Sequence, residues 1–124
     1  MDELEKLERQ YRLEAAKEER QYRLIVKGRE AEKIGDLYGA IKTYNLLVKQ
    51  EYDGTTPYDR LCIIYRKQGK YQQEYDVLQK AIALFIRLSK TSPREDILPK
   101  LEKFKERKEK LLKLAAKKGV PIDV

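Results

Sequence analysis

Few residues in this chain could carry out chemistry, and they stand apart from one another. There is no histidine and only one cysteine, Cys62, so imidazole acid–base catalysis and Ser-His-Asp or Cys-His nucleophiles are excluded. The carboxylate pairs Glu18/Glu19 and Glu30/Glu32 lie in highly charged helical segments, where solvated structural residues are usual. A zinc site would lack ligands, because the chain has no histidine and no second cysteine to bind the metal together with Cys62. We therefore expect a protein that is not an enzyme and that holds no metal or cofactor.

Charge is the main chemical property of the sequence. The 124 residues include 28 Lys and Arg against 21 Asp and Glu, a net charge of +7. The excess is carboxy-terminal, because residues 91–124 carry ten basic and six acidic side chains. Such a balance attracts acidic partners or nucleic acid without specifying either. The lysines from Lys100 to Lys118 alternate with glutamates, which favours a solvated helix face over a nucleic-acid groove.

The expected compartment follows from the apolar residues and the cysteine. No apolar run approaches the roughly 18 residues that span a bilayer. The start Met1-Asp2-Glu3-Leu4 has no apolar signal region. A lone Cys62 fits a reducing setting. We expect a cytoplasmic protein without membrane contact.

The elements that would position these side chains are helices, because strong helix formers run between a few breakers. We expect helices over residues 2–34, 36–51, 57–68, 71–89 and 98–118. Thr56 would cap the third, with Pro57 in its first position. Ser92 with Glu95 three residues later is a second cap signal, and Pro99 predicts a kink or a new start near Leu98.

Two segments repeat each other. Residues 21–54 and 55–88 align without gaps at an offset of 34, the period of a helix-turn-helix array. Gly35 matches Gly69 at the turn within each pair, where a left-handed cap conformation favours glycine. The chain therefore repeats a packing pattern.

Other matched positions predict the core. Gly28 aligns with Cys62, and both stand where one helix would cross another, so a small buried residue is expected and not a reactive thiol. Tyrosines on the apolar stripes are expected in the core rather than in base stacking, namely Tyr44, Tyr58, Tyr65, Tyr71 and Tyr75.

The second segment, Tyr58-x2-Leu61-x3-Tyr65-x3-Gly69-Lys70-Tyr71 followed by Leu78-x2-Ala81, resembles the tetratricopeptide repeat. The first segment matches the same signature at Leu24, Gly28, Gly35-Asp36, Ala40, Tyr44 and Leu47. Lys27 and Ala31 depart from it, and Glu74 replaces the small residue of the second repeat.

The resemblance implies an all-α superhelix of helix-turn-helix repeats. Residues 1–20 would be an amino-terminal helical extension, 21–54 and 55–88 the two repeats, and 89–124 a capping helix with a tail. A cap is needed because two repeats bury too little alone. Its apolar face would be formed by Leu98, Leu101, Phe104, Leu111, Leu112 and Ala115.

The resemblance also implies a function, since such repeats line a concave surface with the first helix of each pair. That surface would present Tyr22, Ile25, Arg29, Lys33, Asp59, Ile63, Arg66 and Lys67 as binding residues, together with Glu32. We expect it to bind a protein or peptide with an apolar anchor and an acidic flank. Arg29 and Arg66 would donate to carboxylates.

Two alternatives remain. The basic carboxy-terminal helix would suit a nucleic-acid-associated factor, although nucleic acid is the less expected partner. Residues 1–20 would suit a self-associating module, because Glu8-Arg9-Gln10-Tyr11-Arg12-Leu13 recurs eleven residues later. The resulting apolar seam of Leu4, Leu7, Tyr11, Ala15 and Tyr22 is interrupted by Glu18, which predicts a weak homodimer.

Overall fold

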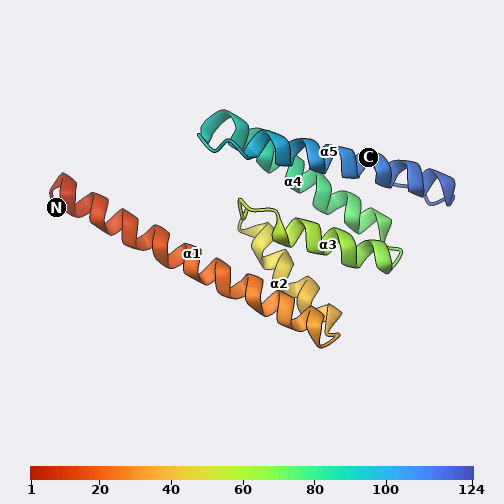
Figure 1. The fold of residues 1–124 in the computed structure, drawn as a ribbon, viewed down its shortest axis with the longest axis horizontal. Helices are drawn as coiled ribbons and strands as arrows, with labels where there is room; N and C mark the ends of the chain where they lie inside the picture. The colour runs from red at the N-terminus through yellow and green to blue at the C-terminus, as the bar shows by residue number, and fades with distance from the viewer.

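A computed structural model describes all of residues 1–124 and contains five α-helices and no strand. The helices are α1 (Glu3–Lys33), α2 (Leu37–Lys49), α3 (Thr56–Lys67), α4 (Tyr71–Thr91) and α5 (Ile97–Lys117). Each helix packs against the next one in the chain (Figure 1). The all-α prediction is confirmed, and the helices fall close to their predicted ranges.

Glycine closes α1 and α3 as predicted. Gly35 has a φ of 82° and Gly69 a φ of 70°. At the first turn, the Gly35 N–H donates to the Glu32 carbonyl at 3.0 Å and the Asp36 N–H to the Ala31 carbonyl at 2.8 Å. These bonds satisfy carbonyls that the helix end leaves unpaired. The backbone then reverses so that α2 returns along α1.

Two predicted caps are wrong. Thr56 is already helical, and Thr55 before it makes no side-chain cap bond. Ser92 ends α4 instead of starting a helix, with an extended ψ of 136°. The physical reason is Pro93, whose ring disfavours a helical conformation in the preceding residue. Helix α5 starts at Ile97, so Pro99 lies in its first turn, where its missing N–H costs nothing.

Aromatic rings join the last three helices. The Tyr58 ring of α3 meets Phe85 of α4 edge-on at 6.5 Å and Phe104 of α5 at 5.9 Å, and the two phenylalanines are 5.2 Å apart. The five tyrosines predicted for the core are all buried. Leu98 was wrongly placed on the apolar face of α5, since it is 62% exposed and Ile97 is buried in its stead.

Helices α1 and α2 approach closely because Gly28 has no side chain. A Cβ atom there would lie under 3.0 Å from three ring carbons of Tyr44. Cys62, at the matching position of α3, is 1% exposed. Both residues are buried as predicted.

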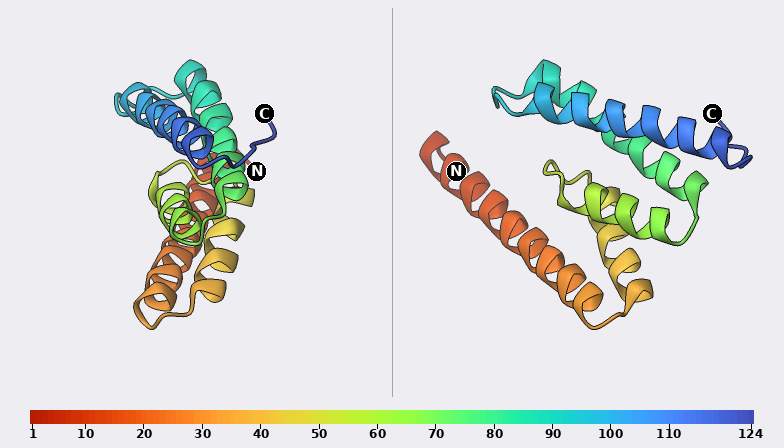
Figure 2. Two further views of the ribbon diagram at one scale, coloured as in Figure 1. Left: turned by 90° about the vertical axis from the view of Figure 1, so that its right-hand side faces the viewer. Right: turned by 45° about the vertical axis from the view of Figure 1, so that its right-hand side comes forward.

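The carboxy-terminal tail packs on α4. The Asp123 N–H donates to Gln72 Oε1 at 2.8 Å, and Gln72 Nε2 donates to the Asp123 carbonyl at 3.2 Å. Ile122 lies against the core. These bonds hold the end of the chain beside the start of α4 (Figure 2).

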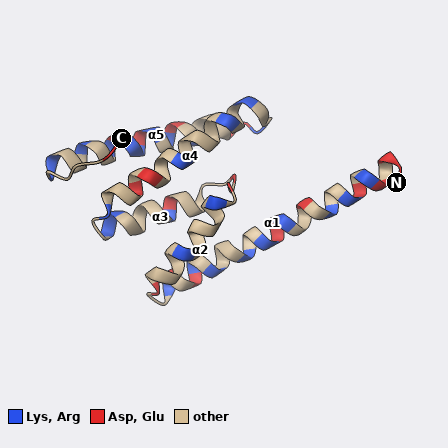
Figure 3. Ribbon diagram, turned by 180° about the vertical axis from the view of Figure 1, so that it is seen from behind, with Lys and Arg blue, Asp and Glu red and all other residues tan.

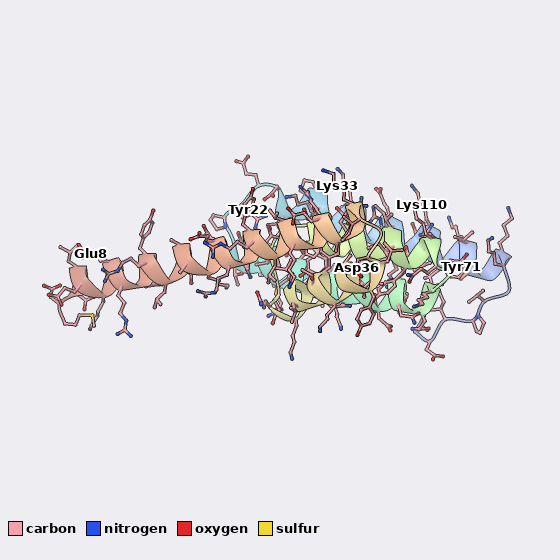
Figure 4. The ribbon with its side chains drawn as sticks, turned by 90° about the horizontal axis from the view of Figure 1, so that it is seen from below. Glu8, Tyr22, Lys33, Asp36, Tyr71 and Lys110 are labelled. Atoms are coloured by element: carbon pink, nitrogen blue, oxygen red, sulfur yellow. The ribbon has the colours of Figure 1, made fainter.

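The first 20 residues form an arm without a partner in the molecule. Every residue from 1 to 20 is exposed, and the arm continues α1 beyond its contact with α2 (Figure 4). None of the five helices has both the length and the apolar character to cross a lipid bilayer.

Candidate protein-interaction groove

A groove between α1 and α3 has a volume of about 830 Å³. We call it the α1–α3 groove, and it is lined by Val26, Arg29, Glu30, Glu32, Lys33, Leu37, Arg60, Ile63, Ile64 and Lys67. Four apolar side chains stand among six charged ones. This mixture suits an amphipathic partner better than a purely polar ligand.

The lining comes from equivalent positions of the two repeated segments. Val26 and Arg60, Arg29 and Ile63, Glu30 and Ile64, and Lys33 and Lys67 are each separated by the 34-residue offset. On both helices these positions follow the spacing of a single helix face. The repeat therefore builds the two walls of the groove with the same geometry and different side chains.

Three cations of the groove have no partner in the molecule. Arg29, Lys33 and Lys67 are exposed and make no ion pair or side-chain hydrogen bond. Among the groove acids, Glu30 is also unpaired, whereas Glu32 is used within the fold. The free charge of the groove is thus positive and available to a carboxylate.

Glu32 ties three helices together at the wall of the groove. Its carboxylate, on α1, accepts from Arg60 Nη2 of α3 at 2.6 Å and from the Tyr44 hydroxyl of α2 at 2.6 Å. Arg60 Nε adds a second bond at 3.0 Å. The expectation that Glu32 is a solvated surface residue is therefore wrong.

These bonds set the charge of Glu32. Burial alone would raise the pKa of this carboxyl, but the hydrogen bonds from Arg60 and Tyr44 outweigh it, so the pKa lies below its ordinary 4.5. The Arg60 pKa is raised by the same hydrogen bond. Both groups stay charged near neutral pH and hold the two walls at a set distance.

Four of the eight predicted site residues lie together in the groove, namely Arg29, Lys33, Ile63 and Lys67. Two others lie elsewhere on α1. Ile25 is buried in the core, with 7% of its surface exposed, because its face turns toward α2. Tyr22 is exposed at the base of the arm.

The remaining two predicted residues are held by partners of their own. Asp59 accepts from Arg107 of α5 at 3.1 Å. Arg66 donates to both carboxylate oxygens of Glu74, at 2.7 and 2.8 Å. Arg66 was expected to bind a partner's carboxylate, but this ion pair already occupies its Nε and Nη2 donors.

Sequence reasoning placed Glu32 on this surface but missed the other five lining residues, which are Val26, Glu30, Leu37, Arg60 and Ile64. A signal for most of them was present. Val26, Glu30 and Lys33 follow helical spacing, and so do their equivalents at the 34-residue offset. On both α1 and α3, the helix face that was predicted to bind a partner is displaced by about one residue from the face that lines the groove.

A second, smaller cavity of about 240 Å³ adjoins the groove beside Cys62, Arg66, Glu74 and Arg107. Burial and the nearby Glu74 raise the pKa of the Cys62 thiol to about 12. A thiol with that pKa is protonated and a poor nucleophile. No group of three or more His, Cys, Asp or Glu side chains is arranged to hold a metal ion.

Two basic residues of α5 are engaged within the fold. Lys108 lies over the Tyr75 ring at 5.7 Å, and Arg107 is paired with Asp59. Acidic and basic residues are interspersed along α5 (Figure 3).

Comparisons of the chain with protein-family models, with curated proteins and with solved structures gave no match.

Proposed function

We propose that this protein is a non-enzymatic interaction module that binds an acidic, amphipathic peptide or helix in the α1–α3 groove. The observation that carries the proposal is the combination of an apolar lining with three unpaired cations, Arg29, Lys33 and Lys67. By contrast, the arginines near the core are already paired with acids, namely Arg60, Arg66 and Arg107. Unpaired lysines also stand beside apolar side chains in another cavity, at Lys49 and Lys80, but the α1–α3 groove is larger.

The chemistry of the groove determines what would fit. Val26 and Ile63 would take one or two apolar side chains of the partner, whose burial supplies most of the affinity. Arg29 on one wall and Lys67 on the other would each meet a carboxylate beside that anchor. The Glu32–Arg60 pair keeps both walls in place before binding, so little ordering is needed.

The architecture that we propose is that of tetratricopeptide repeats, with α1 and α2 as one pair, α3 and α4 as the next, and α5 as the cap. Support comes from the 34-residue offset, the paired turn glycines and the packing of Phe104 against Phe85. We also propose a cytoplasmic setting, supported by the free, buried Cys62.

The test is a peptide-display selection on immobilised full-length protein, followed by anisotropy titration of selected peptides. We expect enriched peptides that carry two or more acids around an apolar residue. Reversing two charges in Arg29→Glu/Lys67→Glu should weaken their binding by at least tenfold, because each lost contact is replaced by like-charge repulsion.

A matched control reverses two exposed cations away from the groove, in Lys80→Glu/Lys113→Glu. This control has the same net charge as the groove variant, so it separates a local contact from general attraction. Equal weakening in both variants, or full binding by the groove variant at physiological salt, would reject the groove as the binding site.

A further inference from the structure

One face of α1 carries a regular series of residues from the free arm into the groove. The series is Leu4, Leu7, Tyr11, Ala15, Glu18, Tyr22, Val26, Arg29 and Lys33. Its intervals of three, four and four residues repeat every eleven, and this period stays on nearly the same face of a helix. The last three members line the groove, while those before Val26 have no partner.

The apolar members on the arm are open to solvent. Leu4 is 65% exposed, Leu7 63%, Tyr11 77% and Tyr22 66%. Four large apolar side chains in a row on a monomer mark a surface that another helix covers. Together the side chains of this series form a strip along α1. The strip is one side chain wide, as in a pair of helices, and is narrower than a helix face that is buried in a core.

Charge identifies the occupant and its direction. The first eight residues contain Asp2, Glu3, Glu5 and Glu8 against a single lysine, whereas the groove end of the same strip carries Arg29 and Lys33. A parallel pair would place like charges together. An antiparallel pair places the acidic end of one copy against the basic end of the other.

We infer that two copies of this chain pair antiparallel through the exposed face of α1, with Ala15 at the two-fold axis. Ala15 then meets Ala15, where a small residue allows close approach. Leu7 of each copy lies against Tyr22 of the other, and Leu4 lies against Val26 at the edge of the groove.

The same register accounts for two of the three charged members of the series, Glu18 and Arg29. Glu18 lies opposite Tyr11, whose hydroxyl is a donor, so the carboxylate that interrupts the apolar seam gains a hydrogen-bond partner. Asp2 and Glu3 reach the partner's Arg29. A two-fold contact of this kind is self-complementary and closes at two copies.

The first test is mass by light scattering over a concentration series up to high micromolar protein. Wild type should shift from monomer toward dimer. Ala15→Arg should weaken the association by at least tenfold, since it places two like charges at the axis. The matched control is Ala16→Arg, an equally exposed neighbour that lies off the strip and should dimerise like wild type.

The second test fixes the direction by disulfide formation under copper–phenanthroline and air. Ala15→Cys should give a cross-linked dimer, whereas Leu4→Cys should not, and Leu4→Cys/Val26→Cys should. Buried Cys62 leaves wild type as the uncross-linked control. Efficient cross-linking of Leu4→Cys alone would show a parallel pair and overturn the inference, as would a wild-type monomer at every concentration.

The dimer and the proposed peptide partner can be tested separately. Ala15 lies eleven residues from Val26, roughly 16 Å along the helix. A substitution at Ala15 therefore weakens the dimer without altering the groove. Peptide binding measured on Ala15→Arg reports on the groove alone.

Discussion

Arg66 and Glu74 form a two-pronged ion pair where α3 and α4 meet, with Nε to Oε1 at 2.7 Å and Nη2 to Oε2 at 2.8 Å. Glu74 is 1% exposed, whereas the Arg66 side chain is 36% exposed. A small residue was expected at position 74 from the repeat signature. The arginine that the sequence suggested for binding instead neutralises this buried acid.

We predict that Glu74→Ala lowers the free energy of unfolding by about 1–3 kcal/mol, since it removes two charge-assisted bonds and leaves a gap. The cost stays below that of a fully buried pair because Arg66 can turn to solvent. Urea unfolding checks this, with the exposed neighbour Gln73→Ala as control. The apolar double variant Arg66→Met/Glu74→Leu should recover most of the lost stability. If it were no more stable than Glu74→Ala, the two residues would not act only through their ion pair.

Gly28→Ala should destabilise the protein by about 1–3 kcal/mol, because the added methyl overlaps the Tyr44 ring. The ring cannot move away freely, since its hydroxyl is held by Glu32 at 2.6 Å. The double variant Gly28→Ala/Tyr44→Leu enlarges residue 28 and shrinks residue 44. It thereby imitates the second repeated segment, where Cys62 and Leu78 stand at the matching positions. Its cost in a thermal melt should be less than the sum of the single costs.

Stability should depend on the charge of Glu32 at acid pH. Because the folded-state pKa lies below the ordinary 4.5, the carboxylate contributes stability above that value, and the contribution is lost as pH falls through the folded-state pKa. We expect Glu32→Gln to be less stable than wild type at neutral pH, with the difference shrinking below about pH 4.5. Glu30→Gln, exposed and unpaired, should follow the wild-type pH curve.

The turn after α2 contains the only non-glycine residue with a positive φ, Glu51 at 55°. Glu51→Gly should raise the free energy of unfolding by about 0.5–1 kcal/mol, because glycine adopts this conformation without strain. The exposed ion pair with Arg87 that is lost is worth little. Gln50→Gly, where φ is −78°, should instead destabilise. Equal shifts of the urea midpoint for both variants would show that the backbone conformation is not the cause.

The sequence by itself determined the helices and their order, because the signals involved are local. Gly35 and Gly69 end helices through their own backbone freedom. The stripes that carry Tyr44 and Tyr65 repeat with the helical period, so burial of these rings followed from pattern alone. The wrong prediction of an N-cap at Ser92 also has a local cause, because Pro93 disfavours a helical conformation at Ser92 and outweighs the capping signal.

Only the tertiary structure decided which face of each helix lines the groove. Adjacent helical residues point about 100° apart, so a small change in how α1 packs on α2 brings a different set of side chains to the groove. That packing buries Ile25 and leaves Val26 partly exposed, and it turns Glu32 toward Arg60, 28 residues away. Such a pair depends on how whole helices cross, and the spacing of residues along one helix does not contain that information.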